Sequence, residues 1–193
     1  MNRQENIYIN IHQDIIDRCK LNEPKAQFQL YKLYYKAMFN TCLRIVNNNL
    51  EAEDIMQESF FKAFEKINLY RGEVSFGAWL KKIVVNHSLD ELRKKKLDLL
   101  SLEEAKVNPV ETTENTIEEE QEIQAKAEEI KEQINQLPDG YRIVLSLYLI
   151  EGYDHDEIGE ILNITSSTSR SQCARARQKL LERIKNNKKE KIY

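Results

Sequence analysis

Apolar side chains recur every three or four positions through residues 24–96, the spacing that places them on one face of a helix. Two breaks divide this stretch, the polar run NNNLEAED and the glycine-containing run NLYRGEVSFG. The pattern therefore predicts three helices, the second of them capped by Asn49. The positions predicted to face inward are Leu30, Leu33, Tyr34, Ala37, Met38, Cys42, Ile45 and Val46, then Ile55, Met56, Ser59, Phe60, Ala63, Phe64 and Ile67, then Leu80, Ile83, Val84, His87, Ser88 and Leu92.

The periodicity is lost after the third helix. Residues 98–116 gather acids and threonines around Pro109 and are predicted to be a flexible linker. Order is expected to resume at Thr116, whose spacing to Glu119 fits a capping box. A helix ending at PDG and a second one, YRIVLSLYLIEG, with Gly152 as its stop, are predicted next. The apolar repeat of the first of these two helices is Ile123, Ala127, Ile130, Ile134 and Leu137.

The stretch DHDEIGEILNITSSTSRSQCARARQKL, residues 154–180, has the spacing of two helices joined by a short turn. Asp154 and Glu157 fit a capping box before the first helix. Asn163 suits a left-handed residue at its end, and Thr165 can cap the second helix. The sequence therefore predicts a helix-turn-helix. Its inward positions are Ile158, Ile161 and Leu162, then Ser169, Cys173, Ala176, Leu180 and Ile184.

Composition favours the same fold class. With 5 Gly and 3 Pro in 193 residues, an all-α protein is expected, built of two small helical domains joined by a flexible acidic linker. No apolar run approaches the roughly 20 residues that span a bilayer, and the N-terminal residues carry no export signal. A cytoplasmic protein is therefore expected. The three cysteines and three histidines lack ligand spacing, so neither a metal nor a cofactor is expected.

The formal net charge of −3 hides a segregation of charge along the chain. Residues 170–191 carry nine Lys and Arg against two Glu, and residues 81–96 carry six bases against two acids. Between them, residues 98–132 carry twelve acids against three Lys. Two basic surfaces separated by an acidic stretch favour nucleic acid as a partner, which the overall charge does not reveal.

The outward face of the second helix of the helix-turn-helix suits the major groove of DNA, because small polar residues precede arginines. The N–H groups of residues 165–168 can hold a phosphate, and Arg and Gln can pair with guanine and adenine. The alternative is a solvated basic helix in an ordinary bundle. The candidate DNA contacts are Thr165, Ser167, Thr168, Arg170, Ser171, Gln172, Ala174 and Arg175.

The first 96 residues contain no Gly-rich loop or strand-end aspartate cluster of the kind that a ligand-binding or phosphoacceptor domain needs. LEAEDIMQESFFKAFEKI and YRGEVSFGAWLKKIVVNHSLDELRKKK resemble region 2 of the extracytoplasmic-function (ECF) sigma factors, a branch of the sigma-70 family. LPDGYRIVLSLYLIEGYDHDEIGEILNITSSTSRSQCARARQKL resembles their region 4. The resemblance covers roughly residues 14–186. It implies an N-terminal extension at residues 1–13, region 2 at 14–97, the linker at 98–116, region 4 at 117–187 and a basic tail at 188–193.

The resemblance implies a transcription initiation factor without catalytic residues of its own. Such a factor binds core RNA polymerase and recognises the −10 and −35 elements of a promoter. The implied partners are the β′ clamp helices and the β flap of core polymerase, together with promoter DNA. An anti-sigma factor is common in the family, although no residue here indicates one. No membrane insertion is implied.

The resemblance also implies residue roles. The polymerase-binding residues would be Asp54, Gln57 and Glu58, with Phe61 as an apolar anchor. The loop at residues 69–77 matches the one that captures a flipped base at −10. The candidates there are Tyr70, Arg71, Phe76 and Asn86, and the candidates for phosphate contacts are Lys81, Lys82, Arg93, Lys94 and Lys95. Trp79 is expected in the core. The positions facing −35 are Arg170, Ser171, Ala174 and Arg175.

Three positions depart from the family pattern. Gly159 stands where alanine is usual and is expected to weaken its helix by up to ~1 kcal/mol. Ser169 replaces a common aliphatic residue, and Asn163 replaces a common glycine. The alternative function is a one-component helix-turn-helix regulator that binds duplex DNA without polymerase. A nucleic-acid enzyme such as a recombinase is disfavoured, because Tyr153 and Ser171 lack the surrounding acids and arginines that such chemistry needs.

Overall fold

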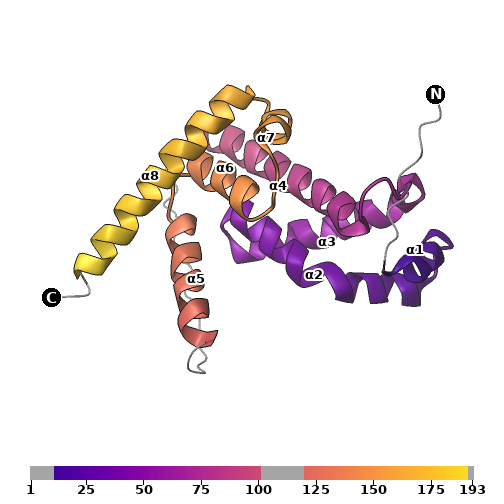
Figure 1. Cartoon of the computed structure of the whole chain (residues 1–193). Helices are drawn as coiled ribbons and strands as arrows, with labels where there is room; N and C mark the ends of the chain where they lie inside the picture. The colour runs from indigo at the N-terminus through magenta and orange to yellow at the C-terminus, as the bar shows by residue number, and fades with distance from the viewer. Residues whose placement is uncertain (1–10, 101–119, 191–193) are drawn as a thin grey trace, which may run out of the picture. The chain divides into compact units, whose positions relative to one another are not determined.

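The computed structural model describes residues 11–100 and 120–190, and within those ranges it consists of helices without a strand (Figure 1). The chain divides into two compact units, residues 1–103 and 104–193. Each unit packs its own helices around its own apolar core, so the expected all-α class is confirmed. Thr116, Glu119 and all but the first three residues of the predicted linker lie outside the described residues.

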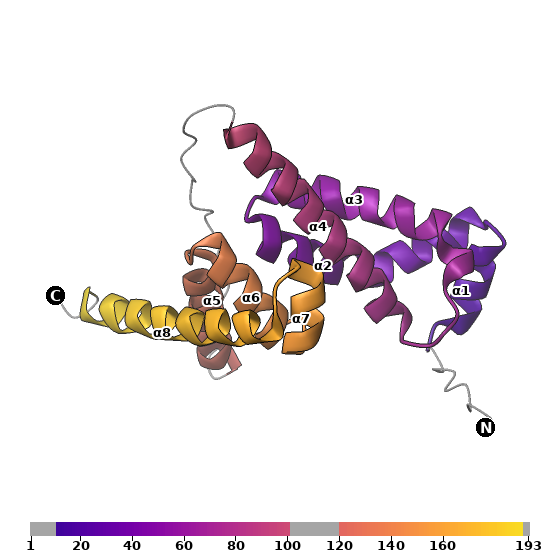
Figure 2. The same cartoon turned by 90° about the horizontal axis from the view of Figure 1, so that it is seen from above.

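In the first unit, the long helices α2 (Pro24–Val46), α3 (Asn49–Glu65) and α4 (Phe76–Leu100) pack against one another (Figure 2). The short α1 (Gln13–Lys20) contacts α2 and the 3-10 turn η1 (Ile67–Leu69). Asn47 ends α2 in the left-handed region, with a φ of 55°. The side chain of Asn48 then caps α3 by accepting from the Glu51 N–H at 3.1 Å. The cap is therefore Asn48 rather than the predicted Asn49.

The buried faces of the first unit follow the predicted periodicity with two kinds of exception. On α2, Leu33 is 48% exposed and Ala37 is also exposed, so these two predicted core positions are wrong. They lie beside the stripe that meets α3 and α4 rather than on it. On α4, Val85 and Leu89 are buried although the predicted stripe omitted them. The reason is that α4 packs against both α2 and α3, which buries a wider face than one neighbour would.

In the second unit, α8 (Ser166–Glu190) packs on α5 (Glu120–Asn135), α6 (Asp139–Leu149) and α7 (His155–Leu162). Ile130 on α5 is 44% exposed and Ala127 is also exposed, so the prediction for these two is wrong. Only the C-terminal end of α5 contributes buried side chains among its described residues. The core consists of Ile134, Leu137, Val144, Leu145, Cys173, Ala176 and Leu180.

The three cysteines are buried free thiols. Burial raises the pKa of Cys19 to about 11 and also raises the pKa of Cys173. Both thiols are therefore protonated near neutral pH and act as small apolar core residues. Within the ranges that the structure describes, no helix is both long enough and apolar enough to cross a membrane.

Candidate nucleic-acid interface

The helix-turn-helix forms with the predicted caps. The Asp154 carboxylate accepts hydrogen bonds from the backbone N–H groups of Asp156 and Glu157, at 2.9 and 2.8 Å, and the Glu157 carboxylate accepts from the Asp154 N–H at 2.8 Å. Asn163 ends α7 in the left-handed region, with a φ of 56°. The Thr165 hydroxyl oxygen then accepts from the Thr168 N–H at 3.0 Å and caps α8. These predictions are confirmed, and the caps fix the turn between the two helices.

The outward face of α8 is open to solvent at the positions predicted to contact DNA. Ser167, Arg170, Ser171, Ala174 and Arg175 are exposed, whereas Thr168 and Gln172 are half-buried. Ser171 donates its hydroxyl proton to the Thr168 carbonyl at 3.0 Å. In the described part of the chain, Arg170 and Arg175 form no ion pair, so both guanidinium groups can bind an anion or a base edge.

Gly159 lies where α7 approaches the turn. A Cβ atom at this position would lie 2.9 Å from the carbonyl oxygen of Ile164 and 3.4 Å from the amide nitrogen of Ser166. The first distance is shorter than a carbon–oxygen contact allows, and a backbone atom cannot move aside alone. The glycine therefore permits the close approach of helix and turn, a role that the propensity argument from sequence did not reveal.

A stack of side chains joins α8 to α6 and α7. The His155 and Tyr148 rings stack with centroids 4.5 Å apart, and the Arg177 guanidinium lies over the Tyr148 ring at 5.2 Å. Nδ1 of His155 lies 2.9 Å from the hydroxyl oxygen of Ser169, which is fully buried. Arg177 therefore packs against its own unit, and Ser169 fills a core position as one half of a polar pair.

In the first unit, α4 presents polar and basic side chains along one side. Lys82, Asn86 and Arg93 are exposed, and their spacings of four and seven residues place them on one helical face. Arg93 pairs with Asp90 at 3.1 Å. Two neighbouring lysines are also paired, Lys94 with Glu91 at 2.6 Å and Lys95 with Glu51 at 2.5 Å. A phosphate backbone that binds this face competes with these exposed ion pairs, which contribute little to stability.

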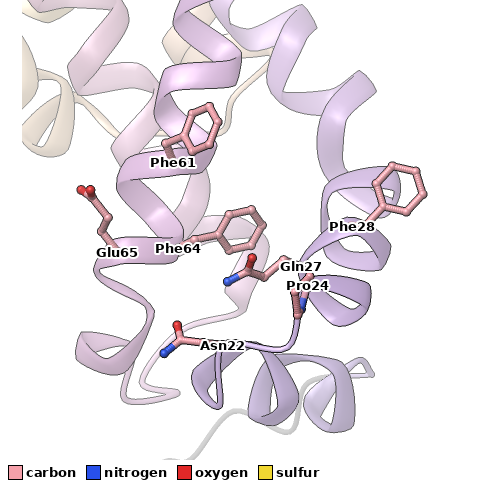
Figure 3. Close-up of a pocket in the computed structure, with 7 residues that line it drawn as sticks. All are labelled: Asn22, Pro24, Gln27, Phe28, Phe61, Phe64 and Glu65. Carbon is pink, nitrogen blue, oxygen red and sulfur yellow. The ribbon is translucent and has the colours of Figure 1, made fainter.

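The acidic edge of α3 lies on another face of the same unit. Asp54, Gln57, Glu58 and Phe61 are all exposed and repeat at intervals of three, one and three residues, so they share one helical face. Phe61 is 71% exposed. It borders a pocket of about 420 Å³ between α3 and the start of α2 (Figure 3). The residues that line the pocket are Asn22, Pro24, Gln27, Phe28, Phe61, Phe64 and Glu65.

Two family models match the chain, one over the helices α3 and α4 and one over the helix-turn-helix. The sigma-70 region 2 model matches residues 30–97, and the sigma-70 region 4 model matches residues 127–180. The chain is also 30% identical over 177 residues to the ECF RNA polymerase sigma factor SigW of Bacillus subtilis, with 88% of this chain and 95% of that protein covered. The chain belongs to the ECF branch of the sigma-70 family. The acidic face of α3 and the basic face of α4 therefore lie in region 2 of this sigma factor, and the helix-turn-helix lies in region 4.

Other proteins are similar to this chain over most of their length. The ECF RNA polymerase sigma-E factor of Haemophilus influenzae is 29% identical over 185 residues, covering 89% of this chain and 94% of that protein. The sigma factor RpoE of Bartonella quintana, solved in complex with the anti-sigma factor NepR, matches with a TM-score of 0.60 at 21% identity, covering 81% of this chain and 95% of that one. CnrH, solved with the cytosolic domain of CnrY, matches with a TM-score of 0.53 at 17% identity, covering 91% and 97%. At these identities, the two solved structures support the fold alone.

Two of the residues predicted to contact the −10 element, Tyr70 and Phe76, have buried side chains in the structure. Tyr70 is 4% exposed and Phe76 is 1% exposed, and their rings pack edge to face with centroids 5.4 Å apart. The Tyr70 hydroxyl donates to the Val74 carbonyl at 2.6 Å. A base cannot stack on rings buried in this way. Both side chains instead pack beneath the loop at residues 69–77, and Tyr70 is hydrogen-bonded to it. Trp79 packs against the same two rings but is half-buried rather than fully in the core, and Arg71 is exposed.

Several structural features of the candidate sites could not be predicted from the sequence. Phe28 lies on α2, more than thirty positions before Phe61, yet both line one pocket. The pair of His155 and Ser169 joins residues 14 positions apart. No periodic pattern connects such positions. The sequence offers one signal for Phe28, because this large aromatic residue lies one turn into a helix between the polar residues Gln27 and Gln29.

Proposed function

We propose that this sigma factor binds core RNA polymerase and directs promoter-specific initiation of transcription, with its second unit reading the −35 element and its first unit holding the −10 element. The observation that carries the proposal is the presence in one chain of two separate charged surfaces, in the order of regions 2 and 4. A lone helix-turn-helix regulator has no need of the acidic and apolar face on α3. The regions proposed are residues 14–97 and 117–187.

At −35, the exposed face of α8 is proposed to enter the major groove. Arg170 and Arg175 are exposed and without ion pairs among the described residues, so each can donate paired hydrogen bonds to a guanine. Ser167 and Ser171 place small polar groups beside them, and Ala174 leaves room for a thymine methyl group. The N–H groups at the start of α8, with the hydroxyls of Thr165 and Thr168, are proposed to hold a phosphate. Gln172 is half-buried and is proposed as a contact at the edge of this surface.

At −10, the exposed face of α4 is proposed to follow the opened strand. Lys82 and Arg93 offer cations to phosphates, and Asn86 between them offers both a donor and an acceptor to a base. Arg71 in the preceding loop is exposed and adds a further cation. Flipping a base costs a few kcal/mol of stacking, which such contacts must offset.

Core polymerase is proposed to bind the exposed face of α3. Asp54, Gln57 and Glu58 suit a basic partner surface, and Phe61 supplies an apolar anchor at the C-terminal end of this face. The partner proposed there is the pair of β′ clamp helices, and the β flap is proposed for region 4. An anti-sigma factor is proposed as a further partner, because the similar sigma factor RpoE was solved in complex with the anti-sigma factor NepR. The proposal places the chain in the cytoplasm and assigns it no catalytic residues, no metal and no cofactor.

The test is run-off transcription on a library of genomic fragments, with purified core RNA polymerase and with or without this protein. The proposal predicts new start sites that share two sequence elements and that appear only when both proteins are present. The same preparations give DNA affinities for the protein alone and for its complex with core enzyme. A protein that binds duplex DNA tightly and selectively alone, and leaves the start sites of core polymerase unchanged, would be a one-component regulator instead.

A further inference from the structure

His87 of α4 and Ser59 of α3 form a buried polar pair inside the first unit. His87 is 7% exposed and Ser59 is 0% exposed, and Nδ1 of His87 lies 3.0 Å from the Ser59 hydroxyl oxygen. The Ser59 hydroxyl already donates its one proton to the Ile55 carbonyl at 2.6 Å, so towards His87 it can only accept. Nδ1 therefore carries the ring proton, and Nε2 of the neutral ring is an acceptor.

Nε2 of His87 faces three charged groups. The Lys62 ammonium nitrogen lies 2.7 Å away and donates to it. Carboxylate oxygens of Glu58 and Glu91 lie 3.3 and 3.7 Å from the same ring nitrogen. Glu58 and Lys62 of α3, Glu91 of α4 and the Ile55 carbonyl thus set the electrostatic environment of the ring. Of these groups, Glu58 belongs to the exposed face proposed to bind polymerase.

The proton on His87 decides how these charges are arranged. Burial, and then the charge of Lys62, lowers the pKa of His87 despite the opposing effect of Glu58 and Glu91. The ring is therefore neutral near pH 7. After protonation, the new N–H at Nε2 meets the Lys62 ammonium at hydrogen-bond distance, so the two cations must separate. Lys62 then moves towards solvent, and the Glu58 carboxylate is drawn to the imidazolium.

We propose that His87 is a positioning residue for polymerase binding and that protonation of its ring weakens the complex. The neutral ring holds Lys62 in place, 3.9 Å from the Glu58 carboxylate, and adds no further positive charge beside that carboxylate. This inference rests on the proposed function, since it needs the α3 face to bind core enzyme. Its direction follows from charge. A surface complementary to Asp54 and Glu58 is basic, and an added positive charge beside them reduces the attraction.

The test compares core-polymerase affinity with the protonation of His87, both measured on the full chain between pH 7.5 and pH 5.5. The ring signals of the three histidines are followed by NMR, and the His87 signal is identified by its loss in His87→Gln. If only the neutral form is competent, the apparent Kd rises by the inverse of the neutral fraction. The Kd should therefore be about twice its pH 7.5 value at the midpoint of the His87 titration.

Matched variants separate this role from a general effect of acid. His87→Gln places an amide oxygen near the position of Nε2 but does not titrate, so its affinity should lose the wild-type pH dependence. His12→Gln removes another histidine of the same unit and should keep that dependence. Lys62→Met removes the cation that lowers the pKa of His87, so both the titration and the change in affinity should move to higher pH. His87→Ala, which leaves Lys62 without an acceptor, should bind more weakly at pH 7.5 than His87→Gln.

Each outcome bears on one of the two proposals. Absence of core binding at pH 7.5 in the wild-type protein overturns the proposed function itself. Binding that is equally strong at both pH values while His87 titrates overturns the positioning role, and so does a His87→Gln variant that keeps the wild-type pH dependence. Trp79 fluorescence and far-UV circular dichroism on every variant identify any that fail to fold. For a variant of His87 that fails to fold, the shift caused by Lys62→Met decides the question.

Discussion

Nδ1 of His155 at the start of α7 lies 2.9 Å from the hydroxyl oxygen of Ser169, a fully buried residue of α8. The same imidazole stacks on Tyr148 of α6, so three helices of the second unit meet at one ring. A serine in place of an aliphatic residue leaves a polar group in the core, and such a group is stable there only when it has a hydrogen-bond partner. His155 is that partner, and the pair fixes the start of α8 against α7.

The first prediction is that His155 and Ser169 are energetically coupled. His155→Phe keeps a ring on Tyr148 but leaves the Ser169 hydroxyl without this partner, which should cost about 1–3 kcal/mol of unfolding free energy. Adding Ser169→Ala removes the stranded hydroxyl and should recover much of that loss. Urea unfolding followed by circular dichroism measures the cycle, and Trp79 in the first unit provides an internal control. Additive losses in the double variant would show that the two residues stabilise the unit independently.

The second prediction concerns the two glycines that lie in helices of the second unit. Gly159→Ala should destabilise this unit although alanine is the better helix former, because its Cβ would lie 2.9 Å from the Ile164 carbonyl oxygen. Gly140→Ala is the matched control, since nothing lies within 4 Å of a Cβ at that position. It should stabilise the unit by up to about 1 kcal/mol. Thermal unfolding of both variants checks the sign, and a higher midpoint for Gly159→Ala would contradict the packing argument.

The features of the fold that could be predicted from sequence are those set by neighbours in the chain. The capping box of Asp154 and Glu157 and the left-handed Asn163 depend on hydrogen bonds or backbone preferences within one turn. They could therefore be read from spacing. Leu33 and Ile130 have the correct spacing but are exposed, because periodicity identifies a helical face and does not say how far the packed neighbour covers it.

The candidate sites were predicted less completely, for a related reason. The exposed charges of α3, α4 and α8 could be assigned because charged residues rarely lie in a core. Aromatic residues give no such signal, since Tyr70 and Phe76 serve equally well as base platforms or as core rings. Only tertiary packing decides between these roles, and here it buries both. Ser59 and His87 are 28 positions apart, and their contact depends on the packing of α3 against α4. The sequence of either helix alone therefore does not predict this pair.

The third prediction is that acid destabilises the first unit through His87. Because the folded state lowers the pKa of this ring, the unfolded chain binds the proton more readily. Stability should therefore be constant above the ordinary value of 6.5 and fall as the pH decreases from there through the folded pKa. Urea unfolding followed by Trp79 fluorescence at pH 7.5 and 5.5 measures the loss, which His87→Gln should reduce. Glu91 does not confuse the result, since its lowered pKa affects stability only below its ordinary value of 4.5.

The fourth prediction separates base reading from phosphate binding on α8. Arg175 is exposed within the proposed groove-facing surface, whereas Lys179 lies one turn beyond it and is also exposed. Arg175→Ala should cost about 1–3 kcal/mol of discrimination at one −35 position and relax the preference there. Lys179→Ala should weaken binding to all promoters about equally and reduce its salt dependence. Run-off transcription on a set of single-base promoter variants, at two salt concentrations, provides both measurements. A uniform loss for Arg175→Ala would make it a phosphate contact.

The fifth prediction is that Phe61 contributes to polymerase binding and very little to folding. Its side chain is 71% exposed, so Phe61→Ala removes little buried area from the isolated protein, and the unfolding free energy should change by less than about 1 kcal/mol. An aromatic anchor that an interface buries is commonly worth about 2 kcal/mol or more, so the Kd for core polymerase should rise at least about thirtyfold. Leu33→Ala is the matched control, because Leu33 is also an exposed apolar residue of the first unit but lies on α2, outside the pocket. Binding is measured by competition with a labelled wild-type protein. If both substitutions change the Kd equally and only slightly, core polymerase does not bind at the α3 face. Because Phe61 is so exposed, its replacement does not disturb folding, and an unchanged Kd would show directly that the side chain makes no contact with polymerase.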